Sequence, residues 1–160
     1  MGSEMCIRDS SSTDNGCYGL DIGEDLSSLI DQVVQIPEDF RIRVGMMNPM
    51  FMPRIRDNLL KSFENDKVFR FLHVPVQSGS NAVLNNMKRG HTVETFRDVV
   101  RKFRAKFGQF TISTDIIVGY PTETQENFEE TISLLKETKP DIVNISRLSL
   151  IHISEPTRPL

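Results

Sequence analysis

The sequence is poor in residue types that mark several large classes of protein. It contains two cysteines, Cys6 and Cys17, and no tryptophan among its 160 residues. Two cysteines at this spacing make neither a disulfide scaffold nor a complete metal site. We therefore expect no disulfide partner and no metal ligands in this chain, and we predict a reducing, cytoplasmic setting.

Long apolar runs and a strong net charge are also missing. No apolar stretch approaches the roughly 20 residues of a membrane helix, so no membrane span is expected. The N-terminus lacks a basic segment followed by an apolar one, which excludes a recognisable signal peptide. The net charge of −3 does not itself favour nucleic acid, although basic residues can still gather locally. With 38% hydrophobic and 26% charged residues, the composition is that of a globular protein, and 160 residues are enough for one domain.

Both ends of the chain look foreign to it. Residues 2–10 read GSEMCIRDS and residues 148–156 read LSLIHISEP. One choice of codons for the first stretch, GGC TCG GAG ATG TGT ATA AGA GAC AG, has a reverse complement that translates in register as the second. This DNA resembles a transposase adapter used in sequencing libraries. We therefore predict adapter-derived tails at residues 1–10 and 148–160, and a single domain at residues 11–147.

Between these tails, strand and helix patterns alternate. The polar residues 11–15 fit the end of a strand that begins upstream. Apolar spacing predicts the following helices and strands, in chain order: a helix from Asp25 to Pro37, a strand at 40–44, a helix at 53–63, a strand at 68–76, a helix at 81–88, a helix capped by Thr92, a strand at 110–118, a helix that ends at Pro140, and a strand from 141. Thr122 and Gln125 fit a capping box for the last helix, and Gly90 suits the position past the helix at 81–88.

This order of elements is typical of a parallel βα architecture. About five strands fit into residues 11–147, which is fewer than a closed barrel contains. We therefore predict an α/β fold, a partial parallel (βα) barrel of about five strands whose first strand is missing. Ligands of such folds bind at the carboxyl ends of the strands, here in polar loops near residues 14–16, 46–49, 75–79 and 115–121.

Several motifs in these loops carry a specific resemblance. Residues 73–80 (HVPVQSGS), 83–92 (VLNNMKRGHT) and 114–124 (TDIIVGYPTET) resemble, in this order, the signature of the radical S-adenosylmethionine (SAM) methylthiotransferases. Residues 14–19 (DNGCYG) resemble the archaeal and eukaryotic branch, which modifies threonylcarbamoyladenosine beside the tRNA anticodon. The resemblance covers essentially all of residues 11–147. It implies an internal fragment of a tRNA methylthiotransferase with a barrel of the radical SAM type.

The resemblance also implies the chemistry of the parent enzyme. That enzyme would use SAM and [4Fe–4S] clusters to add a methylthio group to C2 of the modified adenosine in its tRNA substrate. The family's CxxxCxxC motif is not in this sequence, and Cys17 alone cannot hold a cluster that takes about three or four cysteines. We therefore expect the fragment alone to be inactive and assign it no catalytic residue. The sequence does not indicate its oligomeric state.

Three side chains are the main candidates for SAM contacts. Gln77 resembles a SAM-contacting residue, and the alternative is a loop glutamine bonded to the backbone. Arg89 follows twelve residues later and would pair with the SAM carboxylate, unless it only complements a helix dipole. Asp115 lies in an apolar strand and needs a partner, either ribose hydroxyls or Arg89, or else a structural ion pair or backbone N–H groups.

Other residues are weaker candidates. Gly119 would let the backbone approach the adenine edge, although a tight turn explains it as well, and Asn48, Ser78 and Tyr120 are further candidate contacts. We interpret His73 as a core histidine and His91 as a surface loop residue. Basic residues gather between positions 97 and 106, where a solvated face is the simpler interpretation and a tRNA phosphate contact the alternative.

Two other functions stay open. One is another radical SAM methylthiotransferase, acting on a ribosomal protein or on isopentenyladenosine in tRNA. The other is a non-catalytic remnant that only binds SAM or tRNA.

Overall fold

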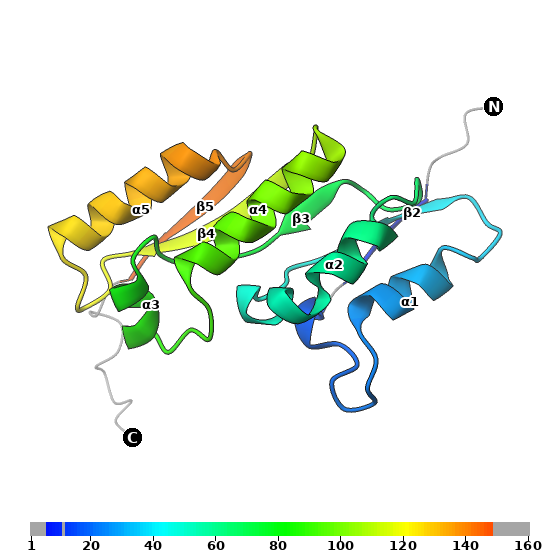
Figure 1. Ribbon diagram of the computed structural model, residues 1–160, viewed down its shortest axis with the longest axis horizontal. Helices are drawn as coiled ribbons and strands as arrows, with labels where there is room; N and C mark the ends of the chain where they lie inside the picture. The colour runs from blue at the N-terminus through cyan, green and yellow to red at the C-terminus, as the bar shows by residue number, and fades with distance from the viewer. Residues whose placement is uncertain (1–5, 11, 149–160) are drawn as a thin grey trace, which may run out of the picture.

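Strands and helices alternate along residues 6–10 and 12–148, which are the residues that the computed structural model describes (Figure 1). The strands are β1 (Cys6–Asp9), β2 (Phe40–Arg43), β3 (Phe71–His73), β4 (Thr111–Val118) and β5 (Ile142–Arg147). The α-helices are α1 (Leu26–Val33), α2 (Met52–Ser62), α3 (Asn81–Asn86), α4 (Val93–Phe107) and α5 (Gln125–Thr138), with 3-10 turns η1 (Asn15–Cys17) and η2 (Pro49–Phe51). The predicted order of elements is confirmed.

All the strand pairs are parallel. β1 pairs with β2, and β3, β4 and β5 form a second sheet in that order. Backbone bonds connect the two groups, because Ile42 bonds to residues 67 and 69, and Met47 N–H donates to the His73 carbonyl at 3.0 Å. This arrangement confirms the predicted partial parallel barrel. No helix among the described residues is long and apolar enough to cross a membrane.

One side of the strands carries the core and the other is open. In Figure 1 the long helices lie on one side of the strands. Ile42, Leu72 and Ile116 face that side and are buried. A set of phenylalanines packs there as well, and the Phe63 and Phe103 ring centroids lie 5.7 Å apart in a T-shaped arrangement. The alternate positions make up what we call the open face, which comprises Arg41, Arg43, Phe69, Phe71, His73, Asp115 and Asn144.

The helix starts follow from local hydrogen bonds. Asp25 caps α1 and Thr92 caps α4, as predicted, since their side chains accept from Ser28 N at 3.1 Å and Thr95 N at 3.4 Å. The capping box predicted at Thr122 is wrong. The cap of α5 is Thr124, whose N–H donates to Asn127 Oδ1 at 3.1 Å.

The end of α3 also differs from the prediction. Lys88, not Gly90, takes the left-handed conformation, with φ of 55°. The Arg89 N–H donates to the Leu84 carbonyl at 2.9 Å and ends the helix, so the chain turns two residues earlier than it would with a left-handed Gly90.

The first predicted tail, residues 1–10, contains β1, and most of the second lies outside the described residues. β1 pairs with β2 from Cys6–Phe40 to Asp9–Arg43. β1 ends at Asp9, and residues 12–14 lie outside any strand, so the prediction that residues 11–15 end a strand is wrong. Strand pairing does not depend on the origin of the residues, so an adapter-derived start stays a prediction. Residues 149–160 of the second tail lie outside the described residues.

Candidate functional site at the strand ends

The loops that follow the strands are bonded to one another along one edge of the barrel. Asn15 N–H donates to the Met46 carbonyl at 2.9 Å, and Met47 N–H donates to the His73 carbonyl. Gln77 N–H then donates to the Asp115 carbonyl at 2.8 Å. Each bond joins one strand end to the next. The four polar loops predicted from the sequence therefore lie side by side.

Asn48 organises the loop that follows β2. Its Oδ1 accepts from Met50 N at 3.1 Å and caps η2. Its own N–H donates to Asp14 Oδ1 at 3.1 Å, and the same oxygen accepts from Gly16 N at 2.9 Å. Asn48 therefore holds two neighbouring loops together, and its carbonyl oxygen is already engaged.

Gln77 is held in an unusual backbone conformation. Its φ is 72°, a left-handed value that costs a residue with a side chain about 1–2 kcal/mol. Two backbone bonds with β4 maintain it, one to the Asp115 carbonyl and one from the Ile117 N–H at 2.9 Å. Strain maintained in this way is a reason to suspect function. The structure therefore keeps Gln77 as a candidate.

Ser78 and Gly79 pack against α5. Ser78 is fully buried, and its Oγ accepts from Ser80 N at 3.2 Å. Gly79 N–H donates to Thr131 Oγ1 at 2.9 Å, and a Cβ at Gly79 would lie 2.4 Å from the Thr131 Cα. Only glycine allows this close approach. Ser78 thus braces the loop from inside, away from the surface where a ligand would lie.

Arg89 lies after α3, two residues before His91, whose Nε2 lies 3.2 Å from the Val76 carbonyl. The residue is half-buried, and its Nε is fully buried with no hydrogen-bond partner among the described residues. A buried donor left unpaired costs about 1–3 kcal/mol. An anionic ligand at this position would remove that cost. This observation favours ligand binding over the interpretation as a charge at a helix end.

The prediction that His91 is a surface residue is wrong. It is 7% exposed, and its Nε2 lies 3.2 Å from the Val76 carbonyl. Burial lowers the pKa of His91, and the nearby Arg89 contributes in the same direction. The Nδ1 atom is buried and has no partner in the described part of the chain. His91 therefore connects the Arg89 segment to the strand end that carries Gln77.

Asp115 has partners that the sequence did not suggest. The Nε2 atom of His73 lies 3.0 Å from both of its carboxylate oxygens, and Asn144 Nδ2 donates to Oδ1 at 2.8 Å. The suggested ion pair with Arg89 does not form. His73 is accordingly satisfied by Asp115 on the open face and is half-buried there.

Gly119 and Tyr120 shape the loop after β4. Gly119 has φ of 75°, and its N–H donates to Glu123 Oε2 at 2.7 Å. The Tyr120 hydroxyl donates to the Asn86 carbonyl at 3.0 Å and ties this loop to α3. A tight turn thus accounts for the glycine, and both residues remain at the edge where the candidate ligand would bind.

The residues present do not fit an iron–sulfur cluster. The sequence holds two cysteines, whereas a cluster takes about three or four thiolate ligands. Cys17 is exposed, and its Sγ lies 3.2 Å from the Asp14 carbonyl oxygen. Among the described residues no three His, Cys, Asp or Glu side chains gather in a way that could hold a metal.

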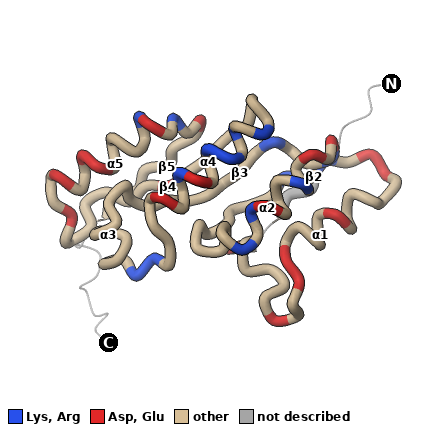
Figure 2. The backbone as a smooth tube through the Cα atoms, in the orientation of Figure 1, with Lys and Arg blue, Asp and Glu red and all other residues tan. Residues whose placement is uncertain are grey.

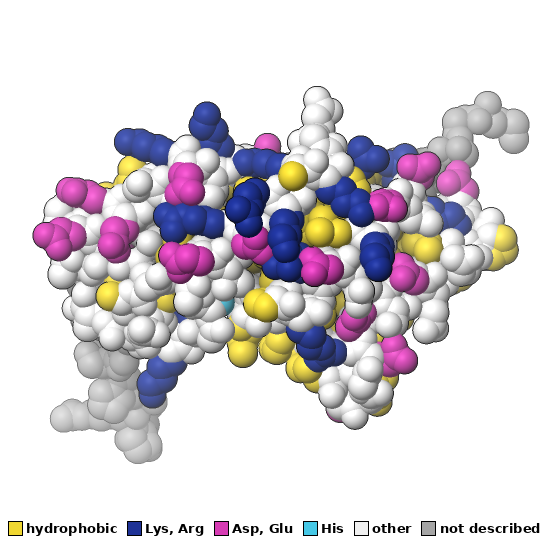
Figure 3. Space-filling model, in the orientation of Figure 1, with side chains coloured by type: hydrophobic (Ala, Val, Ile, Leu, Met, Phe, Trp, Pro, Cys, Tyr) yellow, Lys and Arg dark blue, Asp and Glu magenta, His cyan; other side chains and the backbone are white. Residues whose placement is uncertain are grey.

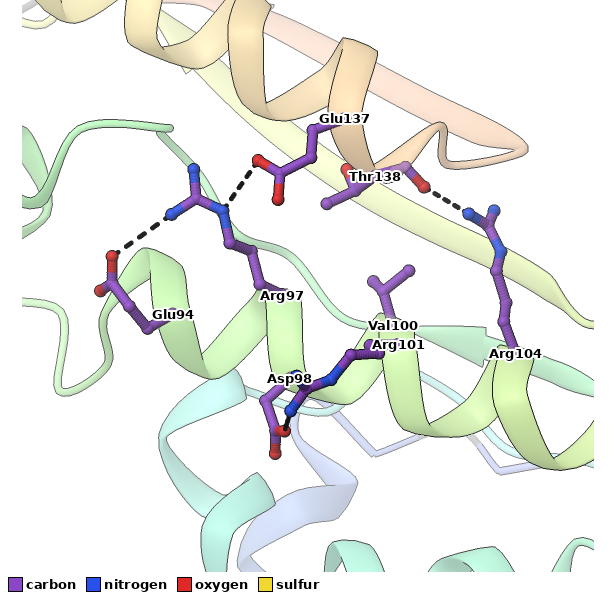
Figure 4. A pocket seen from close by; sticks show the side chains of 8 residues that line it. All are labelled: Glu94, Arg97, Asp98, Val100, Arg101, Arg104, Glu137 and Thr138. Carbon is purple, nitrogen blue, oxygen red and sulfur yellow. Dashed lines mark hydrogen bonds and ion pairs between the residues drawn. The ribbon is translucent and has the colours of Figure 1, made fainter.

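The basic residues of α4 lie away from this edge. Basic positions dominate α4, with Glu94 and Asp98 among them, and acidic positions dominate α5 (Figures 2 and 3). A hollow of about 590 Å³ lies between the two helices, and Arg97 there bonds to Glu137 at 2.9 Å and to Glu94 at 3.3 Å (Figure 4). Arg101 pairs with Asp98 at 2.6 Å. Because these cations are already paired, the arrangement favours a solvated face over a phosphate site.

Comparison with known proteins identifies relatives of the chain. The chain is 48% identical over 139 residues to a Pyrococcus horikoshii protein named "Probable threonylcarbamoyladenosine tRNA methylthiotransferase", covering 87% of this chain and 33% of that one. It is 47% identical over 124 residues to the threonylcarbamoyladenosine tRNA methylthiotransferase of Drosophila pseudoobscura pseudoobscura, covering 77% of this chain and 22% of that one. The chain thus spans a third or less of the length of these relatives.

Solved structures show the same fold at low sequence identity. The radical S-adenosylmethionine methyltransferase TsrM from Kitasatospora setae matches with a TM-score of 0.68 and 15% identity, over 88% of this chain and 27% of that one. Coproporphyrinogen III oxidase HemN from Escherichia coli matches with a TM-score of 0.59 and 21% identity, over 78% of this chain and 28% of that one. The family model of the radical SAM superfamily matches residues 11–135. With this match over most of its length, the chain belongs to the radical SAM superfamily.

Proposed function

We propose that this chain is the SAM-binding and substrate-facing part of a tRNA methylthiotransferase that modifies C2 of N6-threonylcarbamoyladenosine. The observation that carries the proposal is the 45–52% identity to five archaeal relatives with this name, each over 134–139 residues. The geometry agrees, because the polar loops lie together at one edge of a partial barrel.

Arg89 and Gln77 would hold SAM. The guanidinium of Arg89 has a buried N–H that no described residue pairs with, and a carboxylate is the anion that matches its planar geometry. The Gln77 amide would hydrogen-bond the ligand from a backbone that β4 already fixes. When bound to a reduced cluster, SAM supplies the deoxyadenosyl radical of this superfamily.

The cluster itself would come from outside these residues. Since the cysteines present are too few, we predict that the isolated chain neither incorporates iron at a defined site nor cleaves SAM. A reducing, cytoplasmic location, and adapter-derived ends at residues 1–10 and 148–160, also remain parts of the proposal. Sequencing the genomic DNA beyond codons 11 and 147 tests the predicted ends.

A chimera tests the function. Residues 11–147 of this chain would replace the matching segment of the Pyrococcus horikoshii relative, and mass spectrometry of tRNA nucleosides would measure the methylthio product. We expect the chimera to produce 2-methylthio-N6-threonylcarbamoyladenosine. A chimera that folds and binds its clusters but forms no product, while the unaltered relative does, would disprove the proposal. Product on isopentenyladenosine or on a ribosomal protein would support the alternative methylthiotransferases instead.

A further inference from the structure

Three side chains from three neighbouring strands meet on the open face. His73 comes from β3, Asp115 from β4 and Asn144 from β5. His73 Nε2 lies 3.0 Å from each Asp115 oxygen, and Asn144 Nδ2 donates to Oδ1 at 2.8 Å. Asp115 and Asn144 are direct partners in the strand register. The strands therefore place one carboxylate between an imidazole and an amide.

The position of this cluster argues for contact with a ligand. The side chains of His73 and Asp115 are 24% and 31% exposed, on the side of the sheet that the long helices leave uncovered. A partly exposed pair of this kind adds little to stability. Packing alone therefore gives little reason for a carboxylate in the middle of β4.

The hydrogen bonds also leave a second imidazole nitrogen available. Nε2 faces two carboxylate oxygens, so the tautomer with the proton on Nε2 satisfies this contact, and in that tautomer Nδ1 is an acceptor. Among the described residues Nδ1 has no hydrogen-bond partner, and it is not one of the buried unpartnered atoms. Nδ1 therefore offers a lone pair to a ligand in the barrel. The second N–H of the Asn144 amide offers a donor beside the same carboxylate.

We propose that His73 and Asn144 bind the carbamoyl-bearing part of a nucleoside substrate. A carbamoyl group has N–H donors next to a carbonyl acceptor, which complements an imidazole acceptor next to an amide donor. Asp115 is a positioning residue, since it fixes the His73 tautomer and orients Asn144. This inference rests on the proposed function and adds to it a specific contact with the substrate base.

Nuclear magnetic resonance on the 160-residue chain tests the contact. The histidine rings would be ¹⁵N-labelled, and N6-threonylcarbamoyladenosine titrated in, with unmodified adenosine as a second ligand. We expect the Nδ1 resonance of His73 to shift saturably with the modified nucleoside, which should bind at least about five-fold more tightly than adenosine. Equal affinity for both nucleosides, or no shift of His73, would overturn the proposal.

Variants separate the contact from folding. His73→Phe and Asn144→Ala should each weaken binding of the modified nucleoside about five-fold, the loss expected for one hydrogen bond. Thr111→Ser, a change at the start of the same strand β4, is the matched control and should leave the affinity unchanged. Asn144 is exposed, so its variant should fold even if the His73 variant does not. Unchanged affinity in a folded Asn144→Ala chain counts against the proposal.

The result is distinguishable from failure of the proposed function. SAM is titrated into the same sample, and its contacts lie at Arg89 and Gln77, on other loops. Binding of SAM without any effect at His73 would overturn only the carbamoyl contact. Tight nucleoside binding without SAM binding would instead support the contact and count against the SAM site.

Discussion

Arg89 and His91 are two residues apart in the chain, and each has a buried nitrogen with no hydrogen-bond partner in the part of the chain that the structure describes. A buried nitrogen that lacks a partner lowers stability, so such atoms are kept where a ligand or a conformational requirement compensates. For Arg89 the unpaired atom is a donor of a cationic group, as the proposed anionic ligand requires. For His91 it is a ring nitrogen, while the other nitrogen contacts the Val76 carbonyl. The two residues therefore lead to different predictions.

Arg89→Gln should weaken SAM binding. The substitution keeps polarity and approximate length but removes the charge that pairs with the SAM carboxylate. We expect at least a ten-fold loss of affinity, since a charge-assisted hydrogen bond contributes about 1.5–3 kcal/mol. Isothermal titration calorimetry measures it. Lys88→Gln removes the same charge from the neighbouring exposed residue and serves as the control. Equal losses in both variants would indicate a general charge effect and no specific contact.

His91 should make stability depend on pH. Burial lowers its pKa in the native state below the ordinary value of 6.5. As the pH falls through 6.5, the unfolded chain binds the proton first, so the native state loses stability. The loss has a limiting slope of about 1.4 kcal/mol per pH unit. The carboxyl groups with lowered pKa values, such as Asp25 and Asp98, act only at lower pH.

Urea unfolding between pH 7 and pH 5 measures this dependence. The His91→Gln variant keeps an N–H for the Val76 carbonyl but has no titrating ring. Its stability should decline less over this range than that of the unaltered chain. Parallel curves for the two proteins would show that His91 does not titrate differently in the two states.

At the scale of elements, the ends of helices were harder to predict than their existence. The apolar spacing located the five α-helices, because burial of one helix face repeats every three to four residues. The start of α5 was misplaced by two residues, since both Thr122 and Thr124 precede a polar residue at the right spacing. The structure distinguishes them, as the Thr122 hydroxyl instead accepts from Asn86 Nδ2 at 2.8 Å, a long-range contact that sequence spacing cannot reveal.

Thr124→Ala should destabilise the chain more than Thr122→Ala. Loss of the Thr124 cap leaves the Asn127 N–H at the start of α5 without its partner, which costs about 1 kcal/mol. The Thr122 contact is exposed and should contribute a few tenths of a kcal/mol. The free energy of unfolding in urea measures both. A larger loss of stability with Thr122→Ala would mean that Thr122 caps α5, as the sequence suggested.

At the scale of the whole molecule, the sequence was sufficient for the fold and for the edge where the loops meet. Alternating strands and helices of this length permit few arrangements, and parallel strands bring their carboxyl ends together. The pairing of His73, Asp115 and Asn144 could not be predicted in this way, because it depends on register between strands about 30–40 residues apart. The burial of His91 depends in the same way on a long-range contact.

The outer edge of β5 should promote self-association. In the described part of the chain β5 pairs only with β4, and Ile145 on it is 66% exposed. An apolar edge strand is a site for pairing with a second chain. Ile145→Lys should therefore reduce the associated fraction measured by sedimentation velocity, while Lys136→Gln on α5 should not. Association that is unaffected by Ile145→Lys would place the contact elsewhere.

The left-handed Gln77 has a consequence for how a ligand would bind. Two backbone bonds to β4 hold this residue, so the loop lost its conformational entropy when the chain folded. A ligand that meets the Gln77 amide has no loop left to order. Its association should then resemble that of two rigid bodies, with an entropy change dominated by released water and lost ligand freedom.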